Sequence, residues 1–206
     1  MFLIDICKGR FDMTAAQGST LVQALLTRRS HKLVQAPAPD AAQLKMILQT
    51  AVCAPDHAAL RAWRFVIVEQ ENIGKLADLA IDATRKSGRE ITPQKEQNMR
   101  QWLSQVPMLL GLAYQISHDN SKVPEIEQTL SMGAAVMNIQ NAVHMLGFSS
   151  YWSTGLGTYT EEVPAALGLD TLDYRFVGFL AIGTPISAPT PAQRPDVMSM
   201  THTWKP

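Results

Sequence analysis

The longest patterned stretch of the chain is a helix-forming segment that carries apolar residues on nearly every face. It runs from Glu125 to Leu146, and Gly147 follows it as a C-terminal cap. Its large apolar residues include Leu130, Val136, Met137, Ile139, Val143 and Met145. Small residues at 133–135 would let another backbone approach closely. Because a helix that is apolar nearly all round is normally buried, we expect this one at the centre of the fold or in a subunit interface.

Helical and strand patterns alternate along the rest of the chain. Ser19 or Thr20 would cap a first helix that ends at Thr27, and Asp40 with Gln43 forms a capping box for a second. Two prolines keep the segment 34–39 extended. The spacing predicts further helices over 72–86, 93–103 and 160–168, and strands over 64–69, 107–114, 148–152 and 176–182.

The charge balance of the 206-residue chain limits the partners that it can bind. Lys and Arg total 18, as do Asp and Glu, so no basic excess favours a nucleic acid or a membrane surface. Hydrophobic residues make up 46% and charged residues 17%, which is typical of a globular protein. The cysteines Cys7 and Cys53 have no metal-binding spacing. We therefore expect a cytoplasmic protein without a metal site.

The two ends of the chain differ from its middle. Residues 1–18 are expected to form an N-terminal extension, with Met13 as an alternative start, and residues 19–206 a single domain. The tail from 187 to 206 holds several prolines and little that could form a core of its own. We expect this tail either to stay loose or to wrap around another surface.

A compact group of anion-binding side chains follows the first helix. Arg28, Arg29 and Ser30 are consecutive, and they offer two guanidinium forks and a hydroxyl, a donor set that suits a phosphate. The alternative interpretation is a solvated helix end, where cations offset the helix dipole.

Familiar catalytic motifs are absent from the sequence. There is no P-loop, GxGxxG pattern, HExxH motif or nucleophile elbow. The five histidines do not cluster, and His144 is expected to be a core or interface residue. Cys53 is expected to be a small buried apolar residue and not a nucleophile. An enzyme with this sequence would depend on a cofactor for the difficult chemical step.

Three stretches occur together in a specific order and spacing. The first is Arg-Arg-Ser at 28–30. The second is Ala-Pro-Asp-His at 54–57, followed by Trp63 and the strand 65–68, and the third is Gly-Phe at 147–148 with Tyr-Trp-Ser-Thr-Gly at 151–155, backed by 178–185. This arrangement resembles the nitroreductase family of FMN-dependent oxidoreductases, and especially its short bacterial NAD(P)H nitroreductases. The resemblance covers the chain from about Thr20 onward.

The resemblance implies an α+β, nitroreductase-like fold in which a central, mainly antiparallel sheet is flanked by helices. It also implies an entwined homodimer with FMN at the interface and a C-terminal tail that wraps the partner subunit. The implied activity is an FMN-dependent NAD(P)H oxidoreductase, which passes a hydride through flavin N5 to nitroaromatics, quinones or similar acceptors by a ping-pong mechanism. The residues implied to bind FMN are Arg28, Arg29, Ser30, Lys32, Cys53, His57, Trp152, Ser153 and Thr154.

Some positions depart from the family pattern and leave alternatives open. Cys53 stands where similar sequences often carry a basic residue, and Arg61 is hypothesised to compensate for it. His57 would either contact the flavin or form a loop-stabilising hydrogen bond to Asp56 or the backbone. Trp63 is expected to be a core anchor and not a stacking lid. The alternative functions are a non-catalytic FMN-binding module and a specialised enone or imine reductase on the same scaffold.

Overall fold

The computed structural model describes residues 13–188, 190–191 and 193–205, so most of the expected N-terminal extension and Cys7 lie outside it. The helices are α1 (Ala15–Thr27), α2 (Ala41–Ala51), α3 (Gln70–Lys86), α4 (Pro93–Leu103), α5 (Glu125–Met145) and α6 (Glu162–Ala166), with 3-10 turns at His57–Ala59 and Val197–Met200. The strands are β1 (Val34–Gln35), β2 (Trp63–Glu69), β3 (Met108–Gln115), β4 (Ser149–Ser153) and β5 (Tyr174–Pro185).

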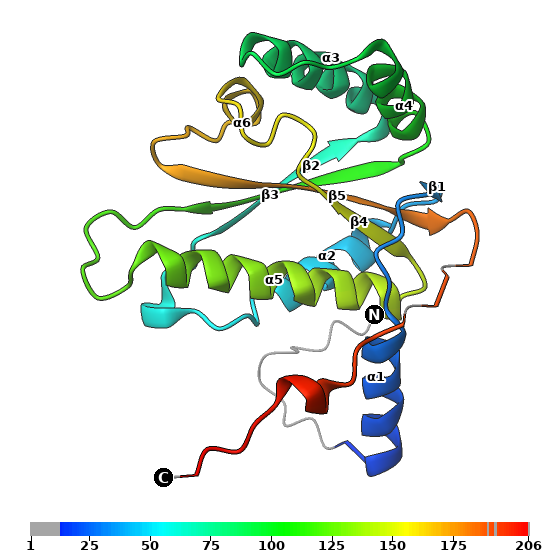
Figure 1. Cartoon of the computed structure of the whole chain (residues 1–206), viewed down its shortest axis with the longest axis vertical. Coiled ribbons are helices and arrows are strands. Elements are labelled where there is room, and N and C mark those ends of the chain that lie inside the picture. The colour runs from blue at the N-terminus through cyan, green and yellow to red at the C-terminus, as the bar shows by residue number, and fades with distance from the viewer. Residues whose placement is uncertain (1–12, 189, 192, 206) are drawn as a thin grey trace.

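The strands form one antiparallel sheet that is organised around the long strand β5. Strand β3 lies between β2 and β5, and β4 and β1 pair with the last part of β5. Helices cover both faces of the sheet, with α3, α4 and α6 on one side and α2 and α5 on the other (Figure 1). The predicted α+β architecture is therefore confirmed.

Alternation along the central strands separates the core into two halves. Successive side chains in a strand point to opposite faces, so Leu109 and Phe179 pack under α3 and α4, while Leu110 and Leu180 pack against α2 and α5. The apolar stripe of α2 and the inward face of α5 fill the second half. Among the described residues, no helix combines the length and the apolar character that crossing a membrane requires.

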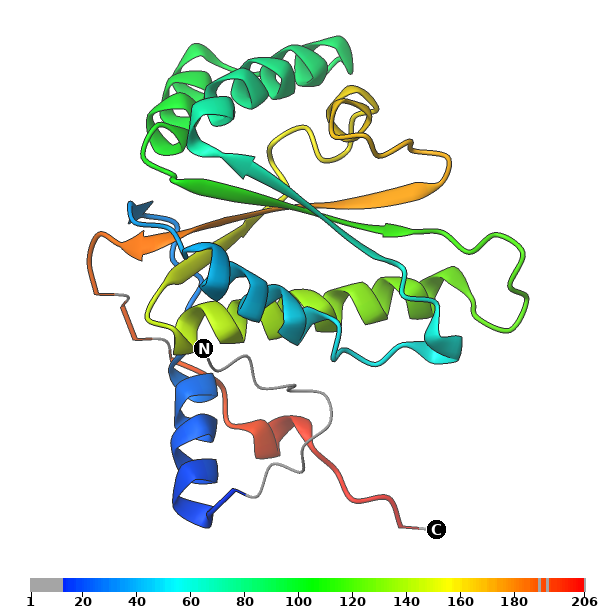
Figure 2. The same cartoon turned by 180° about the vertical axis from the view of Figure 1, so that it is seen from behind.

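Helix α1 and the C-terminal tail project from one end of this body (Figures 1 and 2). The expected cap at Ser19 or Thr20 is wrong, because the helix begins at Ala15 and Thr14 forms a capping box with Gln17. The sequence has a capping-box pattern at Thr14 and Gln17. The large apolar residues that predicted the helix begin only later, at Leu21. None of the residues of α1 is buried.

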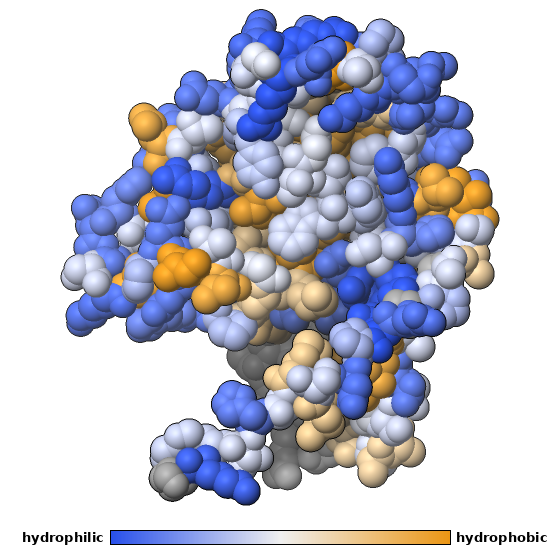
Figure 3. All heavy atoms as spheres, viewed as in Figure 1, coloured by the Kyte–Doolittle hydropathy of each residue, from blue (hydrophilic) through white to orange (hydrophobic). Residues whose placement is uncertain are grey.

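Helix α5 has the predicted extent, and Gly147 follows it with a φ of 83°. Only one side of the helix is buried within the chain, where Val136, Ile139 and Val143 are inaccessible. The opposite side leaves apolar residues in solvent, and orange and tan side chains lie along this helix in Figure 3. The exposed residues are Ile126, Leu130, Met137 and Met145.

Candidate functional site

The segment that follows α1 is held against the edge of the sheet. The backbone N–H of His31 donates to the carbonyl of Ser150 at 3.0 Å, and Ser30 forms a parallel bridge with Ser150. Arg28 caps the helix through its own N–H, which donates to Ala24. The anion-binding group is thus fixed between the end of α1 and β4.

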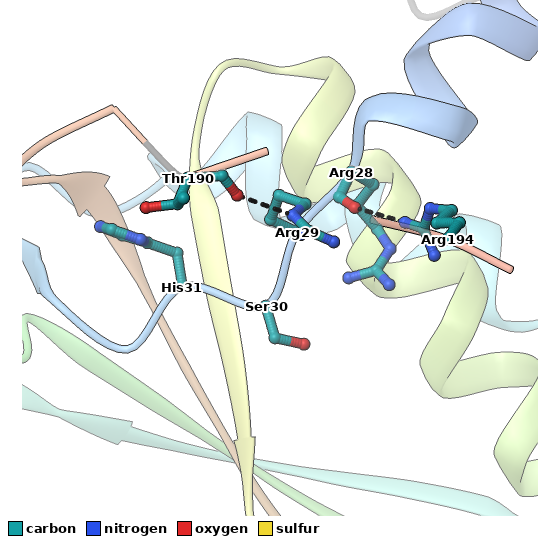
Figure 4. Close-up of a pocket in the computed structure, with 6 residues that line it drawn as sticks. All are labelled: Arg28, Arg29, Ser30, His31, Thr190 and Arg194. Atoms are coloured by element: carbon teal, nitrogen blue, oxygen red, sulfur yellow. Dashed lines mark hydrogen bonds between the residues drawn. The ribbon is translucent and has the colours of Figure 1, made fainter. Parts of the chain in front are cut away.

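The C-terminal tail completes a cavity of about 430 Å³ over this segment. Arg29 Nε donates to the carbonyl of Thr190 at 3.0 Å, and Arg194 Nη2 donates to the carbonyl of Arg28 at 3.0 Å. The side chains of Arg28 and Ser30 point to the same side, and the imidazole of His31 lies apart from them (Figure 4). We call this site the arginine cradle; its lining residues are Arg28, Arg29, Ser30, His31, Thr190 and Arg194.

The cradle concentrates positive charge that the described residues do not neutralise. Its lining contains three guanidiniums and no carboxylate. Burial, followed by the charges of Arg194 and Arg29, lowers the pKa of the Arg28 guanidinium. Arg28 Nη1 is buried and has no hydrogen-bond partner among the described residues. An anion that accepted a hydrogen bond from this atom would satisfy the donor and offset the repulsion.

Two of the predicted site residues line a second cavity, of about 480 Å³, which we call the α4–β4 cleft. Lys32 and Ser153 contribute to its wall beside Tyr151 and Trp102. Lys32 Nζ lies 4.7 Å from the centre of the Trp102 ring, and its carbonyl accepts a hydrogen bond from Trp102 Nε1 at 3.0 Å. Lys32 therefore faces a partly aromatic cleft and not the arginine cradle.

The segment Trp152–Thr154 lies directly on β5. Trp152 Nε1 donates to the carbonyl of Val177 at 2.9 Å. Gly178 has a φ of 110°, and a Cβ at this position would lie 2.5 Å from the carbonyl oxygen of Ser153. Glycine is thus required where the two backbones meet. Thr154 is exposed and Ser153 is buried, so the segment presents backbone and small polar groups beside the α4–β4 cleft.

The remaining predicted residues lie elsewhere in the chain. Cys53 is exposed, so the expectation that it is buried was wrong. The buried positions on either side of it are Ala51 and Ala54, and Cys53 points away from the face that they share. His57 Nδ1 lies 2.6 Å from Glu127 Oε2, so its partner is neither Asp56 nor the backbone.

Three further outcomes concern neighbouring residues. Asp56 instead accepts hydrogen bonds from the backbone of Leu60 and Arg61. Trp63 packs against the core below the sheet and donates to Ser131, as expected of an anchor. His144 is half-buried, and its Nε2 lies 3.4 Å from Thr27 Oγ1.

Sequence reasoning missed His31 and Arg194 as lining residues of the cradle. His31 could have been found, since it directly follows Ser30. Arg194 lies far along the chain, and its only signal was a single arginine next to a proline in a tail without a core.

An antiparallel sheet between two helical layers, with a cationic site at the end of the first helix and a cleft beside it, defines an α+β protein whose site offers hydrogen-bond donors suited to a small anion. A family model described as "Nitroreductase family" matches residues 25–184 of the chain. A relative from Haemophilus influenzae, named "Putative NAD(P)H nitroreductase", is 33% identical over 160 residues, which cover 78% of the chain and 85% of the relative. The chain belongs to the nitroreductase family of oxidoreductases.

Solved structures agree with this assignment at the level of the fold. A nitroreductase-like family protein from Bacillus cereus has a TM-score of 0.75 at 19% identity and covers 96% of this chain and 100% of its own. A putative nitroreductase from Desulfovibrio desulfuricans, in complex with FMN, has a TM-score of 0.69 at 19% identity and covers 90% of this chain and 98% of its own.

Proposed function

We propose that the protein is a cytoplasmic, FMN-dependent NAD(P)H oxidoreductase that reduces nitroaromatics, quinones or similar electron-poor acceptors. The cofactor is FMN, as in the Desulfovibrio desulfuricans structure, and the electron donor is NADH or NADPH, as in the name of the Haemophilus influenzae relative. The single observation that carries the proposal is the arginine cradle, whose buried Arg28 Nη1 lacks a partner among the described residues.

The cradle fits the phosphate of FMN in charge and in donor type. A phosphate monoester carries nearly two negative charges and accepts several hydrogen bonds. Arg28, Arg29 and Arg194 supply guanidinium forks, and Ser30 adds a hydroxyl on the same side as Arg28. The tail contributes one of the three arginines, so it belongs to the binding site.

Ser150, the bridge partner of Ser30, leads into the Trp152–Thr154 segment, so the ring of an FMN held in the cradle would lie along this segment at the edge of the α4–β4 cleft. When bound, FMN accepts a hydride from the nicotinamide and passes two electrons on to the acceptor. Backbone N–H groups of the Trp152–Thr154 segment would serve as donors to the ring, and Lys32, which lines the cleft with Ser153, would supply a positive charge beside it. A nitro group that receives two electrons and two protons becomes a nitroso group and releases water.

The position of His57 supports a second copy of the chain at the site. His57 is paired with Glu127 near the start of α5, whereas His144 contacts Thr27 beside the cradle. At a rise of ~1.5 Å per residue, Glu127 and His144 lie about 25 Å apart along the helix. His57 therefore cannot reach the cradle of its own chain. Antiparallel pairing of the α5 helices of two copies would bring His57 of one copy towards the cradle of the other.

The exposed side of α5 suits such an isologous dimer. Ile126, Leu130 and Met137 lie on one side of the helix, where Gly133 has open space around it. A two-fold axis through this stripe makes the same patch complementary to itself. The predicted roles of His57 and Cys53 then belong to the flavin of the partner subunit.

The tail of the second copy has a surface on which to pack. A groove of about 470 Å³ between α2 and the edge strand β2 is lined mostly by apolar side chains, among them Leu48, Val52 and Phe65. The tail carries apolar residues that are at least 63% exposed, namely Val197, Met198, Met200 and Trp204. Burying these residues in the partner's groove would remove both apolar surfaces from water.

Spectroscopy tests the proposal directly. We expect the purified protein to be yellow, or to become so on adding FMN, and to be bleached by anaerobic NADH or NADPH. The bleached protein should recover its colour when a nitroaromatic or a quinone is added. Binding of FMN without reduction by either nicotinamide would instead identify a non-catalytic flavin-binding module, and a protein that stays colourless with FMN would contradict the proposal.

A further inference from the structure

The lining of the α4–β4 cleft carries a positive charge that FMN binding alone does not require. We infer that the cleft selects electron acceptors that carry a carboxylate on a flat ring, and that Lys95 on α4 is the residue that sets this specificity. This inference rests on the proposed function, because it assigns the substrate class of the same site.

The walls of the cleft define the shape of the ligand. Trp102 and Tyr151 meet edge to face with ring centres 5.8 Å apart, and both line the cleft with Met99 and Leu156. Apolar and aromatic walls on a cavity of about 480 Å³ suit one ring system. A complete dinucleotide would extend beyond it.

The charges at the cleft are positive on both sides. Lys32 is held over the Trp102 ring on the inner wall, and Lys95 lines the cleft from α4. The lining contains no carboxylate, and neither lysine has an ion-pair partner among the described residues. Two ammonium groups over an apolar floor raise the local concentration of anions.

The acidic residue of α4 faces the other way. Glu96 forms ion pairs with Arg85 of α3 and with Arg100, and Arg100 also pairs with Asp78. These pairs neutralise the side of α4 that packs on α3. On the cleft side, Gln94 Nε2 donates to Asn98 Oδ1 at 2.9 Å, so the neighbours of Lys95 are uncharged. The ion-paired charges of α4 thus lie on the side that packs on α3. Lys95 lies on the cleft side, where its charge is available to a ligand.

The first test measures binding without turnover. Isothermal titration of the FMN-loaded protein with benzoate and with benzamide compares two flat ligands that differ in charge. In the Lys95→Glu variant we expect the dissociation constant of benzoate relative to that of benzamide to rise about threefold to tenfold, as for reversal of a partly exposed ion pair. The matched control is Lys122→Glu, which makes the same charge change in the loop before α5 (Figure 1).

The second test uses steady-state kinetics with 4-nitrobenzoate and nitrobenzene. In a ping-pong mechanism, kcat/KM for the acceptor is independent of the donor, so the ratio of the two values reports the acceptor alone. Lys95→Glu should lower the ratio of 4-nitrobenzoate to nitrobenzene by a similar factor, and Lys122→Glu should leave it as in the wild type. The ratio of kcat/KM for NADPH to kcat/KM for NADH should not change in either variant.

The possible outcomes separate this inference from the proposed function. Equal effects on benzoate and benzamide, or an unchanged ratio of acceptors in Lys95→Glu, would overturn the inference even if the protein is a working flavoenzyme. If Lys95→Glu changed the ratio of kcat/KM for NADPH to kcat/KM for NADH and left the acceptor kinetics unchanged, Lys95 would bind the electron donor. That result would also overturn the inference. Failure of the proposed function is recognised separately, by a protein that does not take up FMN or is not reduced.

Discussion

At the scale of single residues, the two adjacent arginines have different surroundings. Arg29 already donates to the carbonyl of Thr190, so it fixes the tail over the cradle. Arg28 has a buried nitrogen without a partner among the described residues, so it is available to a ligand. The hydroxyl of Ser30 lies on the same side as the Arg28 guanidinium (Figure 4). A ligand contact and a tail contact thus come from neighbouring positions.

The first prediction follows from this difference. Arg28→Ala should weaken FMN binding by about 1.5 to 3 kcal/mol, the range for a hydrogen bond to a charged group. Arg29→Ala should cost less, about 0.5 to 1.5 kcal/mol, because one donor of its guanidinium is already bonded to the carbonyl of Thr190 in the tail. Quenching of flavin fluorescence on titration measures both constants. Arg89→Ala, an exposed arginine outside the cradle, is the control, and equal losses for Arg28 and Arg29 would contradict the division of roles.

The sequence predicted the cradle better than the second motif, for a physical reason. Arg28, Arg29 and Ser30 are consecutive, so local geometry alone keeps them together. The environments of Cys53 and His57 depend on which way a loop turns, and Ala58, Ala59 and Arg61 in that loop have positive φ values. An irregular backbone path of this kind produces no periodic pattern of apolar residues from which it could be predicted. The pairing of His57 with Glu127 spans 70 positions and could not be predicted.

At the scale of elements, α5 was the most predictable part of the chain, and its burial was the least. The length of its apolar run and the cap at Gly147 predicted its extent to within one residue of the observed Glu125–Met145. A pattern of apolar residues cannot distinguish a helix buried by its own chain from one buried by a partner. The stripe that includes Leu130 and Met137 decides between the two, because these residues are still 65% and 45% exposed within the single chain.

The second prediction tests that stripe. Leu130 is 65% exposed, so Leu130→Lys should leave the fold of a single chain intact. In the proposed dimer the same change removes buried apolar area and buries a charge, so the dimer dissociation constant should rise by about 100-fold, or about 3 kcal/mol. Sedimentation over a range of concentrations measures it. Leu172→Lys, at a residue that is 76% exposed between α6 and β5, should leave association unchanged.

The third prediction concerns the ion pairs that hold α4 on α3. The hydrogen bond from Arg100, with the charge of Arg85, lowers the pKa of Glu96 below its usual 4.5, while burial opposes the shift. The ionised form therefore stabilises the contact fully above pH 4.5, and this contribution is lost as the pH falls through the lowered pKa. Glu96→Gln should increase amide exchange in α4 at pH 7, and its difference from the wild type should shrink as the pH falls below 4.5.

The matched control for this measurement is Glu90→Gln, which makes the same charge change before α4 at an exposed residue. It should leave exchange in α4 as in the wild type over the same range of pH. Equal exchange in the Glu96 variant and the wild type at pH 7 would mean that apolar packing alone holds α4, through residues such as Trp102 and Leu103.

At the scale of the whole molecule, the two parts of the C-terminal tail have different surroundings. Its prolines and lack of a core left open whether it stays loose or wraps around another surface. Within the chain it closes the cradle through Thr190 and Arg194. Beyond Pro195 it leaves the body, and its last apolar residues remain in solvent (Figures 1 and 2). The two parts of the tail can therefore be tested separately.

The last prediction uses a chain that ends at Pro195. This truncation keeps Arg194 but removes the exposed residues Val197, Met198, Met200 and Trp204. If they pack in the groove of a second copy, the dimer dissociation constant should rise by at least tenfold to 100-fold, about 1.4 to 2.8 kcal/mol, since burying even one of these large apolar side chains contributes about that much. The complementary variant is full-length Arg194→Ala, which should lose FMN affinity and keep the dimer. Sedimentation and flavin titration of both proteins distinguish the roles, and a truncated chain that dimerises as tightly as the full one would place the tail's apolar residues outside the interface.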